Sequence, residues 1–127
     1  AMDGLRRLLG VMADSLSANR SGGARMQIRK AKRYIDNHLG DCGLSLLRVA
    51  EEFSMSPGYF STEFHKQLGY TFTEYLTMAR IQRASELLSH SSLHVYEVAQ
   101  AVGYENTTYF STIFKRRYGV SPRQYRG

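Results

Sequence analysis

The middle third of this chain recurs in its last third, and this internal repeat restricts the possible folds more than any other feature. The sequence Tyr-Phe-Ser-Thr occurs at 59–62 and again at 109–112. The match extends to both sides, where Leu44, Val49, Ala50, Phe64, Gly69 and Tyr75 recur as Leu93, Val98, Ala99, Phe114, Gly119 and Tyr125. Stacked repeat arrays generally need at least about three copies. Two copies therefore predict one compact domain with two lobes and two equivalent contacts.

The composition favours a polyanionic partner. The chain has 127 residues, with 17 Lys and Arg against 11 Asp and Glu, a formal net charge of +6 and a pI near 9.7. A basic balance of this kind is typical of nucleic-acid binding. No apolar run approaches the roughly 20 residues needed to span a bilayer, and the lone Cys42 cannot form an internal disulfide. We therefore expect a soluble, cytoplasmic protein without a membrane partner.

The first residues have no counterpart in either repeat. Residues 3–16 place Leu5, Leu8, Leu9, Met12 and Leu16 on one helical stripe, which predicts an N-terminal extension helix. Residues 17–23 are small, polar and glycine-rich, as in a flexible connector. The stripe could be the end of a coiled coil, a helix docked on the main domain, or a disordered segment. We expect residues 1–23 to come from an upstream region of a larger protein.

The remaining pattern is helical throughout. Apolar spacing predicts helices at 25–39, at 45–53, from the Ser56-Pro57 start signal to Gly69, and at 73–89. The last of these has the length of a strut of about 25 Å. A short helix, a tight turn and a longer helix then return over 95–118, with Asn106 in the capping place of Ser56, and a final turn begins at Pro122. The sequence predicts an all-α fold.

Each repeat matches a helix-turn-helix unit, whose second helix can enter the DNA major groove. In the first copy, Phe60 and Phe64 point inward together, which turns Gly58, Thr62, His65 and Lys66 outward with Ser61 at the margin. In the second copy, Phe110 and Phe114 point inward, and Thr108, Thr112, Lys115 and Arg116 point outward with Ser111 at the edge. Both outward stripes are small and polar first, then basic.

That order of side chains suits DNA. Small residues let a helix lie deep in the groove, hydroxyls can bond base edges, and cations further along the helix reach phosphates. The alternative is that Ser61, Thr62, Ser111 and Thr112 are ordinary exposed helix positions. The helix starts at Ser56 and Asn106 could present backbone amides to phosphate, or these residues could serve simply as caps.

Other polar residues have two interpretations each. The basic face with Arg29, Lys30, Lys32 and Arg33 is either a solvated helix surface or a flank that faces phosphates. We interpret Arg80 as a structural ion-pair residue rather than a phosphate contact. Tyr59 and Tyr109 are expected to pack with their hydroxyls toward solvent. The four histidines, His38, His65, His90 and His94, lack metal-ligand spacing, so we expect no metal or other cofactor.

The second half closely resembles the C-terminal signature of AraC/XylS-type transcription regulators. The matching positions are Ala99-Gln100-Ala101-Val102-Gly103-Tyr104, Tyr109-Phe110, Phe114-Lys115-Arg116, Gly119, Ser121-Pro122 and Tyr125-Arg126. The first half is similar, at Val49-Ala50, Ser56-Pro57, Phe64, Gly69, Tyr75-Leu76, Arg80-Ile81, Ala84 and Leu87-Leu88. The resemblance covers about residues 25–127 and is specific, because many positions agree at fixed spacing.

The resemblance implies two helix-turn-helix subdomains joined by a long linker helix, with about seven helices in all. It divides residues 24–127 into a first subdomain at 24–72, the linker helix at 73–89 and a second subdomain at 90–127. It also implies binding of both units to successive major grooves of bacterial promoter DNA. The expected DNA-binding residues are Ser56, Gly58, Ser61, Thr62, His65, Lys66, Asn106, Thr107, Thr108, Ser111, Thr112, Lys115 and Arg116. Family members often carry a larger side chain at the place of Gly58, so the first unit is expected to read bases less directly.

The most consistent hypothesis is the output domain of a bacterial transcription regulator, an activator of the AraC family, controlled by a sensory or receiver domain that is absent from this chain. RNA polymerase is an expected partner. One helical turn of B-DNA is about 34 Å, so a monomer could span two sub-sites about one turn apart. The sequence shows no catalytic constellation, which argues against an enzyme. A protein-binding module would need large apolar anchors on the outward stripes, and these have none.

Overall fold

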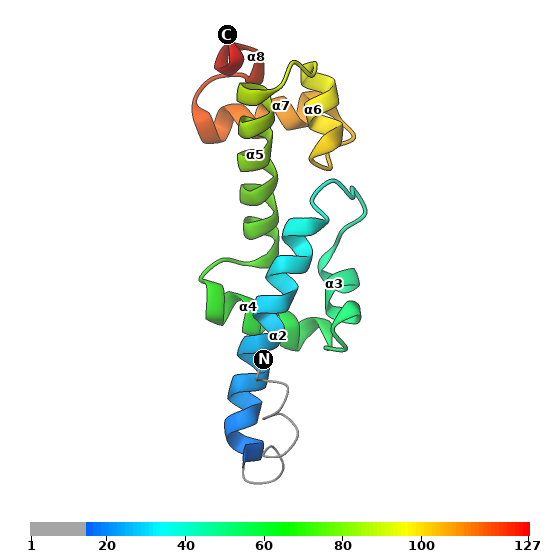
Figure 1. Ribbon diagram of the computed structural model, residues 1–127, viewed down its shortest axis with the longest axis vertical. Coiled ribbons are helices and arrows are strands. Elements are labelled where there is room, and N and C mark those ends of the chain that lie inside the picture. The colour runs from blue at the N-terminus through cyan, green and yellow to red at the C-terminus, as the bar shows by residue number, and fades with distance from the viewer. Residues whose placement is uncertain (1–14) are drawn as a thin grey trace.

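The computed structural model describes residues 15–127, with side chains described from residue 23 onward, and over that part of the chain it contains seven helices and no strand. The helices are α2 (Ser15–Asn37), α3 (Leu46–Glu52), α4 (Pro57–Leu68), α5 (Phe72–His90), α6 (Val95–Ala101), α7 (Thr107–Tyr118) and α8 (Pro122–Arg126) (Figure 1). The predicted all-α fold, with two helix-turn-helix units joined by a long helix, is confirmed.

The start of α2 differs from the expectation. The extension helix predicted at 3–16 lies outside the described residues except for its last two. Residues 17–23, expected as a flexible connector, are helical because α2 begins at Ser15. Each glycine in a helix costs about 1 kcal/mol, but extending an existing helix adds a hydrogen bond per residue without a new nucleation cost. The expected boundary between residues 23 and 24 therefore lies inside one continuous helix.

Caps define both longer helices of the repeated units. The Ser56 hydroxyl accepts a hydrogen bond from the Tyr59 N–H at 3.2 Å, and the Asn106 carbonyl Oδ1 accepts one from the Tyr109 N–H at 2.9 Å. At the other ends, Gly69 and Gly119 adopt φ of 82° and 81°, the left-handed conformation that commonly ends a helix. These local signals explain why α4 and α7 occupy equivalent positions in the two repeats.

Two separate hydrophobic cores give the domain its two lobes. The first contains Ile28, Ile35, Val49, Phe60 and Phe64, together with Phe72 and Leu76 from the first half of α5. The second contains Val98, Phe110 and Phe114, together with Ile81, Ala84 and Leu88 from the second half of α5. Full burial of one such large side chain contributes about 1.5–3 kcal/mol. Because α5 supplies residues to both cores, it fixes each lobe onto one shared helix.

The arrangement puts α4 and α7 on the same side of the molecule. In Figure 1, α4 passes behind α2 and α7 passes behind α5, and both pairs are in contact. Three side-chain hydrogen bonds join α2 and α8 to α5 and to the residue that follows it. The Tyr75 hydroxyl donates to Asp36 Oδ1 at 2.5 Å, joining α5 to α2, and Arg126 donates to the carbonyl oxygens of Leu88 and Ser91 at 3.0 and 3.2 Å. Both lobes are thus held against α5.

Across residues 15–127, no helix has the length and apolarity required to cross a membrane.

Candidate nucleic-acid interface

The outer face of α4 carries the residues that the sequence analysis predicted to point outward. Phe60 and Phe64 are fully buried, whereas Gly58, Ser61, Thr62, His65 and Lys66 are all exposed. A Cβ added at Gly58 would meet no atom within 4 Å, so the surface at the start of α4 is open. The outer face of α4 therefore has small, polar residues near the start of the helix and basic residues near its end.

The terminal cation of α4 is partly neutralised within the same helix. Lys66 Nζ lies 3.6 Å from Glu63 Oε2, in an ion pair whose lysine side chain is 69% exposed. Because the cation of this pair is largely in solvent, the pair contributes little to stability and salt weakens it. Lys66 also borders a shallow hollow shared with the α2 cations Arg25, Arg29 and Lys32. This hollow joins the basic face of α2 to the end of α4.

The outer face of α7 repeats the pattern with more positive charge. Thr108, Thr112, Lys115 and Arg116 are exposed, and Arg117 extends the basic end. The Thr112 hydroxyl donates to the Thr108 carbonyl oxygen at 3.1 Å, so its hydrogen is used and its oxygen can still accept hydrogen bonds. The remaining residues expected on this face are Asn106, which is exposed and caps the helix, and Thr107 and Ser111, which are half-buried.

Thr107 and Ser111, which are half-buried, line a second shallow groove. Its other lining residues come from α6 and α8 and include Tyr96, Arg123 and Arg126. Sequence reasoning missed this groove, because no face of α7 alone indicates which helix packs next to it. The available signal was Ser121-Pro122, a helix start signal that places Arg123 in the first turn of a helix beside α7.

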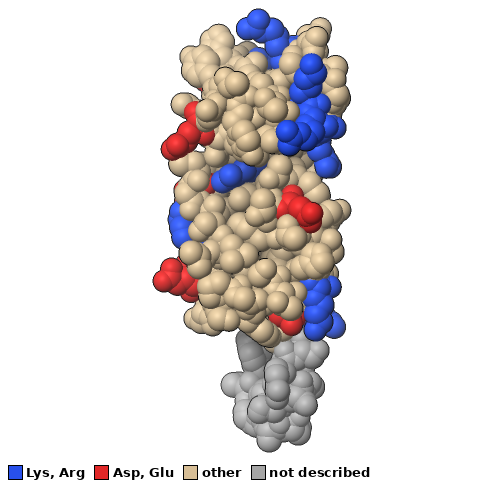
Figure 2. All heavy atoms as spheres, turned by 180° about the vertical axis from the view of Figure 1, so that it is seen from behind, with Lys and Arg blue, Asp and Glu red and all other residues tan. Residues whose placement is uncertain are grey.

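Basic side chains gather at one edge of the shared face. Figure 2 shows the molecule from behind, with a large group of Lys and Arg along one edge in the upper half, a smaller group at the same edge in the lower half, and an acidic patch within otherwise uncharged surface between them. His65 and Lys66 occupy the last turn of α4, and Lys115, Arg116 and Arg117 occupy the last turn of α7. Cations there also interact favourably with the helix dipole, which accounts for part of their placement.

Arg80 differs in detail from the expected ion-pair residue. It is structural, being only 8% exposed, but its guanidinium donates to backbone carbonyl oxygens rather than to a carboxylate. Nε donates to Leu39 O at 3.0 Å and Nη2 donates to Asp41 O at 2.8 Å. Sequence periodicity gives no information about such partners, because they lie about 40 residues away along the chain.

Tyr59 and Tyr109 flank the two outer faces. They are 45% and 55% exposed, and the Tyr109 ring lies 6.0 Å from that of Tyr104, centroid to centroid. The His38 ring stacks on that of Tyr34, with 4.0 Å between the ring centroids. Within residues 15–127, no group of three or more His, Cys, Asp and Glu side chains is placed to hold a metal ion.

A helix-turn-helix domain family matches residues 49–127 of the chain. The regulatory protein PocR of Salmonella typhimurium is 40% identical over 100 residues, which cover 79% of this chain and 33% of PocR. Among solved structures, the C-terminal domain of AraT, a response regulator from Geobacillus stearothermophilus, matches with a TM-score of 0.77 and 43% identity. That match covers 79% of this chain and 83% of the AraT domain.

Another match is the DNA-binding domain of AdpA, a global transcriptional factor, whose structure was solved in complex with a target DNA. It matches with a TM-score of 0.74 and 26% identity, and the match covers 78% of this chain and 88% of that domain. The chain spans about one third of the length of PocR.

Proposed function

The chain belongs to the AraC/XylS-type family of helix-turn-helix transcription regulators, and from this premise we propose that it binds double-stranded promoter DNA with α4 and α7 in successive major-groove segments. The observation that carries the proposal is the pair of equivalent outer faces. Each is capped at its start, small and polar over its first turns and basic at its end, and both lie on one side of α5.

In this proposal the second unit supplies most of the base reading. Thr108 and Thr112 are exposed, and a threonine methyl suits contact with a thymine methyl. Lys115 and Arg116 lie one turn later and would contact phosphates, which supplies affinity without sequence information. Thr107 and Ser111 face the groove beside Arg123, so they would lie at the margin of the contact.

The first unit would contribute position more than sequence. Gly58 provides no side chain for base contact, while Ser61 and Thr62 are exposed hydroxyl residues that can bond to bases or phosphate. His65 and Lys66, backed by the basic face of α2, would contact the phosphate backbone. The amides at the helix starts, next to Ser56 and Asn106, add two further sites for phosphate oxygens.

The wider role follows from the relatives. PocR is a regulatory protein three times as long as the aligned segment, and AraT is a response regulator whose matching part is its C-terminal domain. We propose that this chain is likewise the output domain of a longer bacterial regulator, with a sensory or receiver domain upstream of it. Activation would involve contact with RNA polymerase.

Selection of bound sites from random DNA, followed by substitution of the second unit, tests the proposal. Thr112→Ala should weaken binding to the selected site about fivefold and leave binding to random DNA unchanged. Lys115→Ala and Arg116→Ala should weaken binding to both DNAs. Each should make the slope of log affinity against log salt concentration shallower by about 0.9, the value for one phosphate that is no longer neutralised.

Matched controls are available on α5. Ser89→Ala removes an exposed hydroxyl, and Arg83→Ala removes an exposed cation paired with Glu86 at 3.2 Å, neither of them on α4 or α7. Both should bind like the wild type. Equal losses on selected and random DNA for all three α7 variants would refute the assignment of roles, and absence of any enriched sequence would refute the function.

A further inference from the structure

Arg80 lies at the boundary between the two hydrophobic cores. Leu76, one turn before it, belongs to the first core, and Ile81, immediately after it, belongs to the second. The guanidinium is buried and donates to Leu39 O and Asp41 O, both in the loop between α2 and α3. A residue in the middle of the shared helix is therefore bonded to the backbone of the first lobe.

The other side of the same guanidinium packs against the second lobe. A Cβ added at Gly103 would lie 2.7 Å from Arg80 Nε and closer still to the carbonyl oxygen of Leu39, so only glycine fits there. The Tyr104 ring stacks over the guanidinium, with its centroid 5.5 Å from Arg80 Cζ. Arg80 is thus held between the α2–α3 loop and the turn between α6 and α7.

The two lobes also touch directly around this point. A Cβ added at Gly40 would lie 2.7 Å from the carbonyl oxygen of Ala101, and the Cys42 thiol donates to Glu105 Oε2 at 3.1 Å. We call residues 39–42, Arg80 and residues 101–105 the inter-lobe clasp. Among the described residues these contacts join the lobes independently of the covalent connection through α5.

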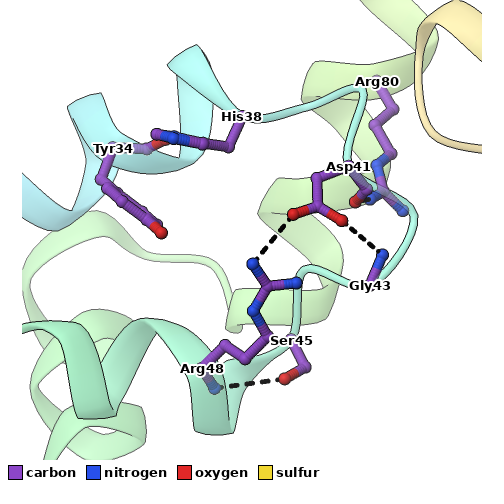
Figure 3. Close-up of polar contacts among 7 residues, drawn as sticks. All are labelled: Tyr34, His38, Asp41, Gly43, Ser45, Arg48 and Arg80. Atoms are coloured by element: carbon purple, nitrogen blue, oxygen red, sulfur yellow. Dashed lines mark hydrogen bonds and ion pairs between the residues drawn. The ribbon is translucent and has the colours of Figure 1, made fainter.

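The loop side of the clasp is also hydrogen-bonded to the first unit. Figure 3 shows the Asp41 carboxylate accepting bonds from the Gly43 N–H at 2.8 Å and from Arg48 Nη2 at 2.9 Å. The hydrogen bond from Arg48 is the main reason why the pKa of Asp41 lies below its usual value, and this carboxylate therefore stays ionised near neutrality. Because Arg48 is part of α3, a force on the loop is transmitted to the first helix-turn-helix unit.

A comparison of the two turns shows that the clasp is specific to the second. In the first unit the equivalent turn contains Ser54, at φ 55°, which is exposed to solvent. In the second it contains Gly103, at φ 94°, which is buried against Arg80 and Leu39. The same left-handed turn accepts a side chain where nothing packs on it. The second turn requires glycine because the first lobe approaches it.

We infer that Arg80 is a positioning residue that fixes α7 relative to α4 and thereby determines which spacing between two DNA sub-sites the chain prefers. The inference rests on the proposed function. The turn that contacts Arg80 leads directly into α7, so its displacement would move that helix. Each added base pair shifts the second sub-site by about 3.4 Å and about 34° around the duplex, which a rigid pair of helices cannot follow.

The test compares duplexes in which the two selected sub-sites are separated by spacers varied one base pair at a time, together with each sub-site alone. The wild type should bind the best spacing at least about tenfold more tightly than a spacing one base pair longer. In Arg80→Met this ratio should fall below about threefold, while affinity for each single sub-site changes by less than about twofold.

Two further variants separate positioning from folding. Arg80→Lys keeps the positive charge but lacks the planar guanidinium that reaches both carbonyl oxygens, so its preference for the best spacing should be intermediate. If Arg80→Met does not fold, Arg80→Lys alone tests the positioning role. Arg83→Met, on an exposed part of the same helix, should retain the wild-type ratio. A ratio that is unchanged in folded Arg80 variants, or equal losses on all duplexes and single sub-sites, overturns the inference.

The outcome for the wild type distinguishes this inference from the proposed function. Binding to each sub-site without any spacing preference would refute the inference alone, whereas no binding to either sub-site would refute both. A measurement without DNA provides a second test. Spin labels carried by non-canonical amino acids at positions 52 and 100, on α3 and α6, leave Cys42 in place and should give a narrow distance distribution that broadens with Arg80→Met. An unchanged width would contradict the role of Arg80.

Discussion

Alanine at Gly103 should destabilise the protein far more than alanine at Gly69, although both glycines have a left-handed backbone. Their φ angles are 94° and 82°. A non-glycine residue in this conformation costs about 1–2 kcal/mol, and the smaller entropy of the unfolded alanine chain returns about 0.4–1 kcal/mol. The backbone term alone therefore predicts a loss of about 1 kcal/mol at either position.

The surroundings separate the two sites. A Cβ at Gly69 would meet nothing within 4 Å, but a Cβ at Gly103 would lie 2.7 Å from Arg80 Nε. Relieving that overlap moves Arg80 away from its two carbonyl acceptors, and hydrogen bonds to charged groups contribute about 1.5–3 kcal/mol each. As the clasp opens, water forms hydrogen bonds with the released groups and offsets part of this loss of stability. We expect Gly103→Ala to lose about 3–5 kcal/mol in total.

Urea unfolding followed by circular dichroism at 222 nm measures the difference. Gly58→Ala completes the series as a third alanine substitution, in an open helical position where it should stabilise the protein by about 0.5–1 kcal/mol. If Gly103→Ala lost within about 0.5 kcal/mol of the loss at Gly69, the clasp would make no energetic contribution and Arg80 would not hold the lobes together.

Three further outcomes are expected. The hydrogen bond from the Cys42 thiol to Glu105 raises the pKa of that thiol. Alkylation of Cys42 by iodoacetamide should therefore accelerate at a higher pH in the wild type than in Glu105→Gln. Identical pH profiles of the alkylation rate in the two proteins would contradict the contact. Burial, with the hydrogen bond to Asp36, raises the pKa of Tyr75, so the stability that Tyr75 contributes should be constant below about pH 10 and decline above it, because the unfolded chain loses the proton first. Tyr75→Phe should weaken that decline in alkaline urea titrations, and an unaltered decline would exclude Tyr75 as its source. Asn106→Ala should cost about 1 kcal/mol in urea unfolding by removing the cap of α7, and no change would show that the cap bond is dispensable.

The sequence was sufficient where structure depends on neighbouring residues. Ser56 and Pro57 start α4, and Gly69 ends it, because capping involves groups within one turn of the helix. The inward placement of Phe60, Phe64, Phe110 and Phe114 follows from helical period alone. The repeat then transfers each of these assignments from one lobe to the other.

Contacts between distant segments could not be obtained in the same way. The partners of Arg80 are backbone carbonyls of another lobe, and a carbonyl has no sequence signature. The start of α2 at Ser15 depends on cooperative extension from a packed helix, which local composition does not reveal. The groove between α7 and Arg123 required knowledge of how α8 packs.

Hydroxyl-radical footprinting of this chain on its selected duplex tests most directly whether α4 and α7 bind together. We expect two protected segments on one face of the duplex, about 10–10.5 base pairs apart. Substituting His65 and Lys66 with alanine should weaken one segment, and substituting Lys115 and Arg116 should weaken the other. A single protected segment, or two segments on opposite faces of the duplex, would contradict binding by two helices fixed side by side.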